Sequence, residues 1–125
     1  MSTISVSITG ELSYKEGNNV IFFSAYDVVY AEYQDDRCTV FLSNRATHTI
    51  CCQLKEILEC KPTMYILVNR NVLINMKFIR IINKSHVVLA GNIEIDTSIR
   101  KHRTLLKTMQ VKAKNDKKDF IKLHT

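Results

Sequence analysis

The chain has 125 residues, of which 46% are hydrophobic and 24% charged, with only three glycines and one proline. This length suits one domain with a single core, and the composition excludes a disordered or fibrous protein. No stretch approaches the roughly 18 consecutive apolar residues of a membrane helix, and the polar N-terminus lacks the apolar block of a signal peptide. We therefore expect one cytoplasmic domain.

The formal net charge is +6 at pH 7, and it is unevenly distributed. From residue 100 onward, nine basic residues stand against two acidic ones and give +7, so residues 1–99 sum to −1. A basic arm suits contact with a polyanion, and a solvated tail explains the charge equally well. The nine basic residues are Arg100, Lys101, Arg103, Lys107, Lys112, Lys114, Lys117, Lys118 and Lys122.

The first half of the chain predicts short antiparallel strands. Ile4, Val6 and Ile8 alternate with polar residues, which is the period of a half-buried strand. Turn residues then separate further short apolar runs. We expect a turn at 15–19, apolar runs within 20–33, a hairpin tip at 35–37, a strand over 38–43, and another strand after a turn at Asn44.

One short helix is expected at residues 53–60, where Leu54, Ile57 and Leu58 share a face and Pro62 follows. The next segment, YILVNRNVLIN at 65–75, is apolar at both ends and polar in the middle. A buried strand would have to satisfy every polar group of that triplet. The triplet therefore lies at a bend or faces something other than the core.

The rest of the chain predicts a turn at 83–85, a strand at 86–90, a turn at Gly91-Asn92 and a strand at 93–95. Helical spacing begins near Ser98, with Ile99, Leu105, Leu106 and Met109 as its apolar members, which favours a C-terminal helix. Residues 110–125 form a basic tail, either a mobile arm or a docked strand. The expected class is a mainly β domain of short antiparallel strands and hairpins, covering residues 1–109.

The order of these parts resembles the LytTR-type DNA-binding domain, from about residue 19 to residue 109. That family combines a V-x-Y-h-E strand, an LKEhL helix, a strand with a polar triplet closed by Asn, an apolar hairpin with Gly, and S-x-R before an LL pair. The matching residues are Val28 to Glu32, Leu54 to Leu58, Tyr65 to Asn75, Gly91, Ser98 to Arg100, and Leu105 with Leu106. In that family the triplet is often His-Arg-Ser, whereas here it is Asn69-Arg70-Asn71. The family usually has a basic residue two positions before the triplet, and this chain has Leu67 there.

The resemblance implies a compact β fold whose loops enter successive major grooves of double-stranded DNA. Three regions would touch DNA: Asp36 with Arg37, the triplet at 69–71, and Ser98 with Arg100 and the adjacent Lys101. The apolar residues that flank the triplet, Ile66, Val68, Val72 and Ile74, would anchor it in the core. We therefore predict DNA-binding residues at Arg37, Asn69, Arg70, Asn71, Ser98, Arg100 and Lys101.

The chemistry of these side chains fits that assignment. Arg70 offers paired donors to guanine, and Asn can pair with adenine. Asn69 and Asn71 have an equally good structural explanation, since short amides stabilise bends by bonding nearby backbone. Arg100 would attract phosphate. Ser98 would bond phosphate or cap the following helix.

Enzyme chemistry is not expected. The four histidines are spread evenly, no glycine-rich phosphate loop is present, and the four cysteines form no CxxC pair, which favours reduced structural thiols over zinc binding. We expect no metal, cofactor or small-molecule substrate. Asn75 is expected to be structural, closing its strand through backbone hydrogen bonds.

The leading expectation is a sequence-specific transcriptional regulator that binds direct repeats, with a homodimer on DNA as an option. We expect no receiver domain of about 120 residues, such as often precedes this module, so control would come from abundance, a partner or oligomerisation. One alternative is a β-rich protein-interaction module that has lost DNA binding, favoured by Leu67, Asn69 and the −1 charge of residues 1–99. Another is nonspecific attachment through the basic tail alone.

Overall fold

The computed structural model describes the backbone of residues 3–6 and 10–124, with side chains at residue 4 and residues 10–112. Strands dominate, and two α-helices accompany them, so the expected mainly β architecture is confirmed. Ile8 lies outside the described residues. The strands are β1 (Thr3–Val6), β2 (Glu11–Glu16), β3 (Asn19–Ser24), β4 (Val28–Gln34), β5 (Arg37–Leu42), β6 (Thr47–Ile50), β7 (Tyr65–Asn69), β8 (Val72–Asn75), β9 (Ile79–Ile82), β10 (His86–Leu89) and β11 (Ile93–Asp96).

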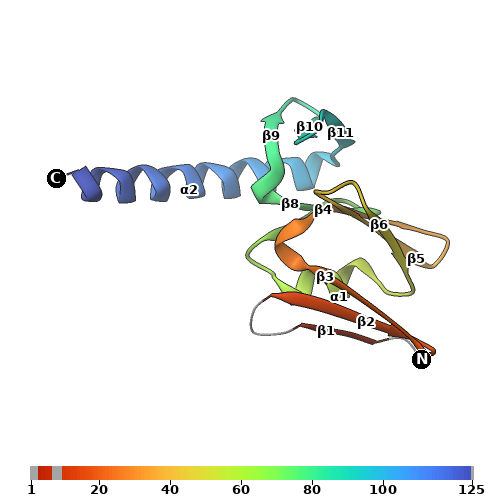
Figure 1. Cartoon of the computed structure of the whole chain (residues 1–125). Helices are drawn as coiled ribbons and strands as arrows, with labels where there is room; N and C mark the ends of the chain where they lie inside the picture. The colour runs from red at the N-terminus through yellow and green to blue at the C-terminus, as the bar shows by residue number, and fades with distance from the viewer. Residues whose placement is uncertain (1–2, 7–9, 125) are drawn as a thin grey trace.

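The strands form three antiparallel sheets. A five-stranded sheet, in the order β6-β5-β4-β8-β7, is the centre of the molecule. The three-stranded sheets β1-β2-β3 and β11-β10-β9 lie on opposite sides of it (Figure 1). Two short 3-10 helices, η1 (Ala25–Asp27) and η2 (Met76–Phe78), lead into β4 and β9. The expected short helix is confirmed as α1 (Leu54–Cys60).

Each face of the central sheet supports its own core, because neighbouring residues of a strand point to opposite faces. Ala31 and Leu73 point toward β2, β3 and α1, where they meet buried Tyr14 and Ile57. Ile74 belongs to the second core, with β9–β11 and the second α-helix. The central sheet is thereby covered by a core on each face, although Thr47 and Thr49 of β6 stay exposed.

The segment at 65–75 is a hairpin, and its polar triplet is the bend. β7 and β8 pair from Tyr65↔Asn75 to Asn69↔Val72, with Arg70 and Asn71 forming the turn. Side chains flanking the turn pack in the second core, as expected; they are Ile66, Val68, Val72 and Ile74.

The structural role of Asn75 is also confirmed. Its side chain is 0% exposed, its Nδ2 donates to the Val28 carbonyl at 2.9 Å, and its Oδ1 accepts from the Lys77 N–H at 3.0 Å.

The C-terminal segment differs from the expectation. One continuous helix, α2 (Ile99–His124), runs through residue 110, so residues 110–124 are neither an irregular arm nor a docked strand. Figure 1 shows α2 extending away from the sheets. Leu105 is buried, as a helical period predicts, whereas Ile99 is 77% exposed. The boundary between a domain at 1–109 and a basic tail stays a prediction.

Candidate nucleic-acid interface

Two hairpin turns lie side by side at one end of the central sheet. β4 and β5 are joined at Asp35-Asp36, and β7 and β8 at Arg70-Asn71. Because β4 pairs with β8, the two turns are neighbours, and the Tyr33 N–H donates to the Asn71 carbonyl at 2.8 Å. We call this the tip end of the sheet.

The start of α2 is fixed to the same end. The Ser98 N–H donates to the Val68 carbonyl at 2.9 Å, and Asn69 Nδ2 donates to the Asp96 carbonyl at 2.7 Å. These bonds join segments about thirty residues apart in the sequence. Arg70 and Arg100 therefore extend from two segments that are hydrogen bonded to each other.

All seven predicted residues reach the surface at or beside the tip end. Asn69 is half-buried, and the other six are exposed: Arg37, Arg70, Asn71, Ser98, Arg100 and Lys101. The structure thus brings the three predicted segments together. Contact of these residues with DNA stays a prediction.

Some of these side chains already make hydrogen bonds within the protein. Asn69 Oδ1 accepts from the Asn71 N–H at 2.8 Å, which stabilises the turn in the way short amides do. Ser98 Oγ accepts from the Lys101 N–H at 3.3 Å, and the Ser98 carbonyl accepts from the His102 N–H at 2.8 Å, so Ser98 caps α2. Among the described residues the arginine side chains at 70 and 100 make no hydrogen bond or ion pair.

The Arg37 region is more acidic. Asp35 and Asp36 adopt positive φ angles of 53° and 63°, as a two-residue hairpin turn of this type requires. Asp36 Oδ1 accepts from the Tyr33 hydroxyl at 3.1 Å, which holds this carboxylate against the sheet. Arg37 follows directly and is exposed. Two carboxylates next to Arg37 reduce the attraction of this loop for phosphate.

The structure adds residues that the sequence did not single out. The turn between β9 and β10 also reaches the tip end, because the Thr97 N–H donates to the Ser85 carbonyl at 2.9 Å. Exposed Lys84 lies in that turn. His102 is 8% exposed and its Nδ1 lies 2.7 Å from the Thr97 hydroxyl, which fixes the first turn of α2. Nothing in the local sequence marks Lys84, since its placement depends on pairing across the sheet.

Basic residues continue along α2 from the tip end. Arg100, Arg103 and Lys107 are exposed and follow the spacing of one helical face. The opposite face carries His102 and Leu105, which are buried. The positive stripe therefore faces away from the core and toward solvent.

Other site types find no support in the described part of the chain. Among the described side chains, those of residue 4 and residues 10–112, no group of three His, Cys, Asp or Glu is arranged to hold a metal ion. The helices described there are too short or too polar to cross a membrane. All four cysteines are thiols, and Cys38 and Cys52 are buried.

A β scaffold that presents hairpin turns and a basic helix start from one end offers a surface suited to a polyanion. The chain matches the sequence model of the LytTr DNA-binding domain over residues 18–110, and it belongs to that family. A solved structure, the LytTr DNA-binding domain of a protein described as a methyl-accepting/DNA response regulator from Bacillus cereus, has a similar fold. Its TM-score is 0.68 at 18% identity, over 80% of this chain and 96% of that one. No curated protein matches the chain.

Family membership makes this chain a DNA-binding regulator in class, and the solved structure supports the fold. The expected resemblance from residue 19 to residue 109 is therefore confirmed within one residue at each end.

Proposed function

We propose that the protein is a sequence-specific transcriptional regulator that inserts the tip end of its central sheet into the DNA major groove. The turn at Arg70-Asn71 reads bases, and the start of α2 holds the adjacent phosphates. The observation that carries this proposal is the pair of hydrogen bonds joining Val68 to Ser98 and Asn69 to Asp96, because they connect the segments that carry Arg70 and Arg100.

Arg70 is the base-reading candidate because its guanidinium extends from a turn whose backbone is already bonded. Asn69 Oδ1 holds the Asn71 N–H, and the Asn71 carbonyl accepts from the neighbouring strand. Such preorganisation leaves the arginine donors available to guanine O6 and N7. Asn71 has no side-chain hydrogen bond among the described residues, so its amide is also available.

Arg100, Lys101 and Lys84 supply phosphate contacts in this proposal. They are exposed and lie beside the reading turn without a carboxylate partner within 4 Å in the described residues. Phosphate contacts position a protein on DNA without reading its sequence. Arg37 contributes less, because Asp35 and Asp36 repel the same phosphates.

The test begins with selection of bound duplexes from a random pool, followed by anisotropy titrations on the selected duplex and a scrambled one at several salt concentrations. Arg70→Gln is expected to weaken binding to the selected duplex by at least about tenfold, and binding to the scrambled one much less. Arg100→Gln is expected to weaken both and to reduce the salt slope by about one. We also propose that two copies of the protein bind direct repeats. The selected duplexes show whether such repeats occur.

Arg80→Gln is the matched control. Arg80 is exposed, but its guanidinium donates to the Lys77 and Ile79 carbonyls, at the other end of β9 from the turn holding Lys84. The Arg80→Gln variant loses the same single charge, and its affinity for both duplexes is expected to stay within about twofold of the unmodified chain.

Three outcomes contradict the proposal. Equal affinity for selected and scrambled duplexes excludes sequence-specific recognition. Absence of DNA binding at low salt favours a protein-interaction module. Loss of binding on replacing Lys112, Lys114 and Lys117 by Gln, with Arg70→Gln silent, assigns binding to the C-terminal basic segment alone.

A further inference from the structure

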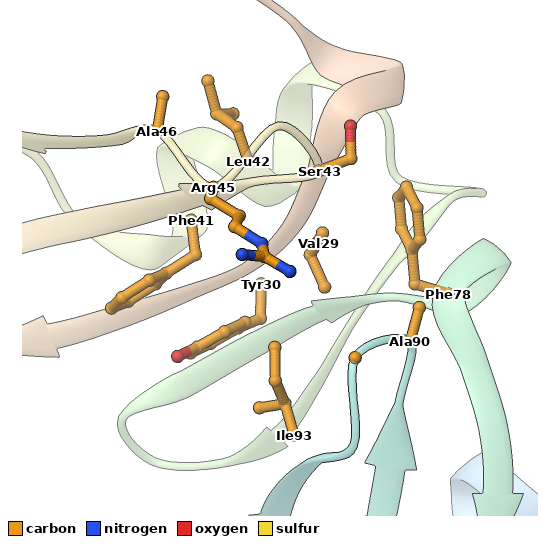
Figure 2. A pocket seen from close by; sticks show the side chains of 11 residues that line it. Val29, Tyr30, Phe41, Leu42, Ser43, Arg45, Ala46, Phe78, Ala90 and Ile93 are labelled. Atoms are coloured by element: carbon orange, nitrogen blue, oxygen red, sulfur yellow. The ribbon is translucent and has the colours of Figure 1, made fainter.

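A cavity of about 600 Å³ opens at the other end of the central sheet, which we call the cavity end. β4 begins here, β5 and β6 are joined here by the turn at 43–46, and the Gly91-Asn92 turn closes the other side. Figure 2 shows Val29, Tyr30, Arg45 and Ile93 around a shared space. The lining residues are Val29, Tyr30, Phe41, Leu42, Ser43, Arg45, Ala46, Phe78, Ala90, Gly91 and Ile93.

One wall of the cavity carries two stacked aromatic rings. The rings of Tyr30 and Phe41 stack with centroids 4.2 Å apart and planes 5° from parallel. Both rings are half-buried, and Val29 and Ile93 extend the apolar wall. A planar apolar group can pack against the edges or the outer face of such a ring stack.

Arg45 brings the only positive charge among the lining side chains. Its guanidinium points over the cavity in Figure 2. In the described part of the chain it makes no hydrogen bond, no ion pair within 4 Å and no stacking on a ring. A cation in this position, above an apolar surface and without a protein partner, attracts an anionic group.

The backbone at Arg45 gives a second, independent indication. Its φ is +72°, a left-handed conformation that costs an arginine free energy. The turn is fixed by bonds from Arg45 N–H to the Leu42 carbonyl and from Ala46 N–H to Asn44 Oδ1, at 3.0 Å and 2.9 Å. Strained positions of this kind cluster at ligand sites. An asparagine or glycine would serve the turn better than the arginine does.

We propose that this cavity binds a small organic anion with a flat apolar body, an aromatic carboxylate in chemical class. The carboxylate pairs with the Arg45 guanidinium, and the ring packs on Tyr30 and Phe41. The cavity volume lies within the usual range for small-molecule sites, about 300–1,000 Å³. The site is at the opposite end of β4 from the tip end, so it is separate from the proposed DNA-binding surface and does not depend on it.

The experiment uses the full chain and naphthoate as the probe, with uncharged naphthamide as its matched analogue. Amide resonances of residues 42–46 and 90–93 are followed by heteronuclear NMR during titration. Naphthoate is expected to shift them saturably, and naphthamide to bind at least about tenfold more weakly, since a charge-assisted bond is lost.

Two variants identify the site. Arg45→Gly removes the guanidinium while suiting the left-handed turn, and it is expected to raise the Kd for naphthoate about tenfold without loss of fold. Ala90→Leu fills the cavity and keeps Arg45, and it is expected to abolish the shifts. Lys55→Gln, on α1 and ion-paired with Glu59 at 3.9 Å, removes one charge elsewhere and is expected to change nothing.

The proposal is overturned if naphthoate causes no saturable shift at these residues, or if naphthamide binds equally well. It is also overturned if Arg45→Gly binds naphthoate as the unmodified chain does. Concentration-dependent shifts of the same resonances without any probe would assign the cavity to contact between two copies of the chain instead.

Discussion

At the tip end of the central sheet, polar and basic side chains project from turns whose backbone groups are bonded to one another. At the cavity end, aromatic and aliphatic side chains surround a hollow, and one arginine stands over it. The same strands supply both ends. The difference arises because the tip end satisfies its polar groups within the backbone, while the cavity end leaves an apolar surface incompletely covered.

The largest expected effect comes from comparing two asparagines, one just before β8 and one at its last position. Asn75 is buried and bonded to Val28 and Lys77, whereas Asn71 is exposed at the tip end. Asn75→Ala is expected to lower the free energy of unfolding by about 2–4 kcal/mol, because a buried carbonyl loses its donor and η2 loses its cap. Urea unfolding followed by circular dichroism measures it.

Asn71→Ala is the matched control and is expected to stay within about 0.5 kcal/mol of the unmodified chain. Equal losses for the two variants would show that the tip-end turn depends on the Asn71 side chain. That result would remove the distinction between a framework asparagine and one available for DNA.

Local chemistry explains why many elements could be predicted. The Gly17-Asn18, Asp35-Asp36 and Gly91-Asn92 turns contain residues that tolerate positive φ, and the apolar runs between them alternate as strands do. α1 is marked by Leu54 and Ile57 on one face and is stopped near Pro62. These signals lie within a few residues and need no knowledge of tertiary contacts.

Other features depend on contacts between distant segments. The bond between Val68 and Ser98, the placement of Lys84 beside Thr97, and the cavity under Arg45 follow from strand pairing that no local pattern specifies. The C-terminal helix was missed beyond Met109 for another reason. That segment lacks a clear apolar stripe, although its Lys, Gln and Ala residues have high intrinsic helix propensity.

The next test concerns how strongly the tip end is joined to α2. Asn69→Ala removes bonds to the Asp96 carbonyl and the Asn71 N–H, which are 2.7 Å and 2.8 Å long. The expected loss is about 1–2 kcal/mol of unfolding free energy, since each such bond contributes about 1 kcal/mol. Binding to the selected duplex is expected to weaken as well, because Arg70 loses its fixed turn.

Asn69→Asp separates the two bonds. The carboxylate keeps the acceptor for Asn71 but cannot donate to Asp96, so about half of the stability loss is expected. Full stability in both variants would mean that the Val68–Ser98 backbone bond alone holds the two segments together.

A smaller effect of opposite sign is expected at the cavity end. Arg45→Gly relieves the left-handed backbone at φ +72° and is expected to raise the unfolding free energy by about 0.5–1 kcal/mol. Asp36→Gly, at φ +63°, is the control at the tip end. Its gain is expected to be smaller, because aspartate tolerates this region better and loses its bond from Tyr33 on substitution. A clear loss of stability for Arg45→Gly would show that the arginine side chain packs favourably.

The smallest expected effect concerns Cys60, at the end of α1 nearest the cavity end. Burial raises the pKa of the Cys60 thiol, and Glu59 and Glu56 raise it further. A raised pKa means less thiolate at a given pH, so Cys60 is expected to react with iodoacetamide more slowly in the folded chain than in urea at pH 8. Peptide mass spectrometry over time measures the rate.

The variant Glu59→Gln removes one carboxylate and lowers the pKa of the Cys60 thiol. It is expected to speed the reaction of the folded chain by less than about tenfold, since one exposed charge shifts a pKa by under about one unit. An unchanged rate in that variant would leave burial and Glu56 as the causes of the slow reaction.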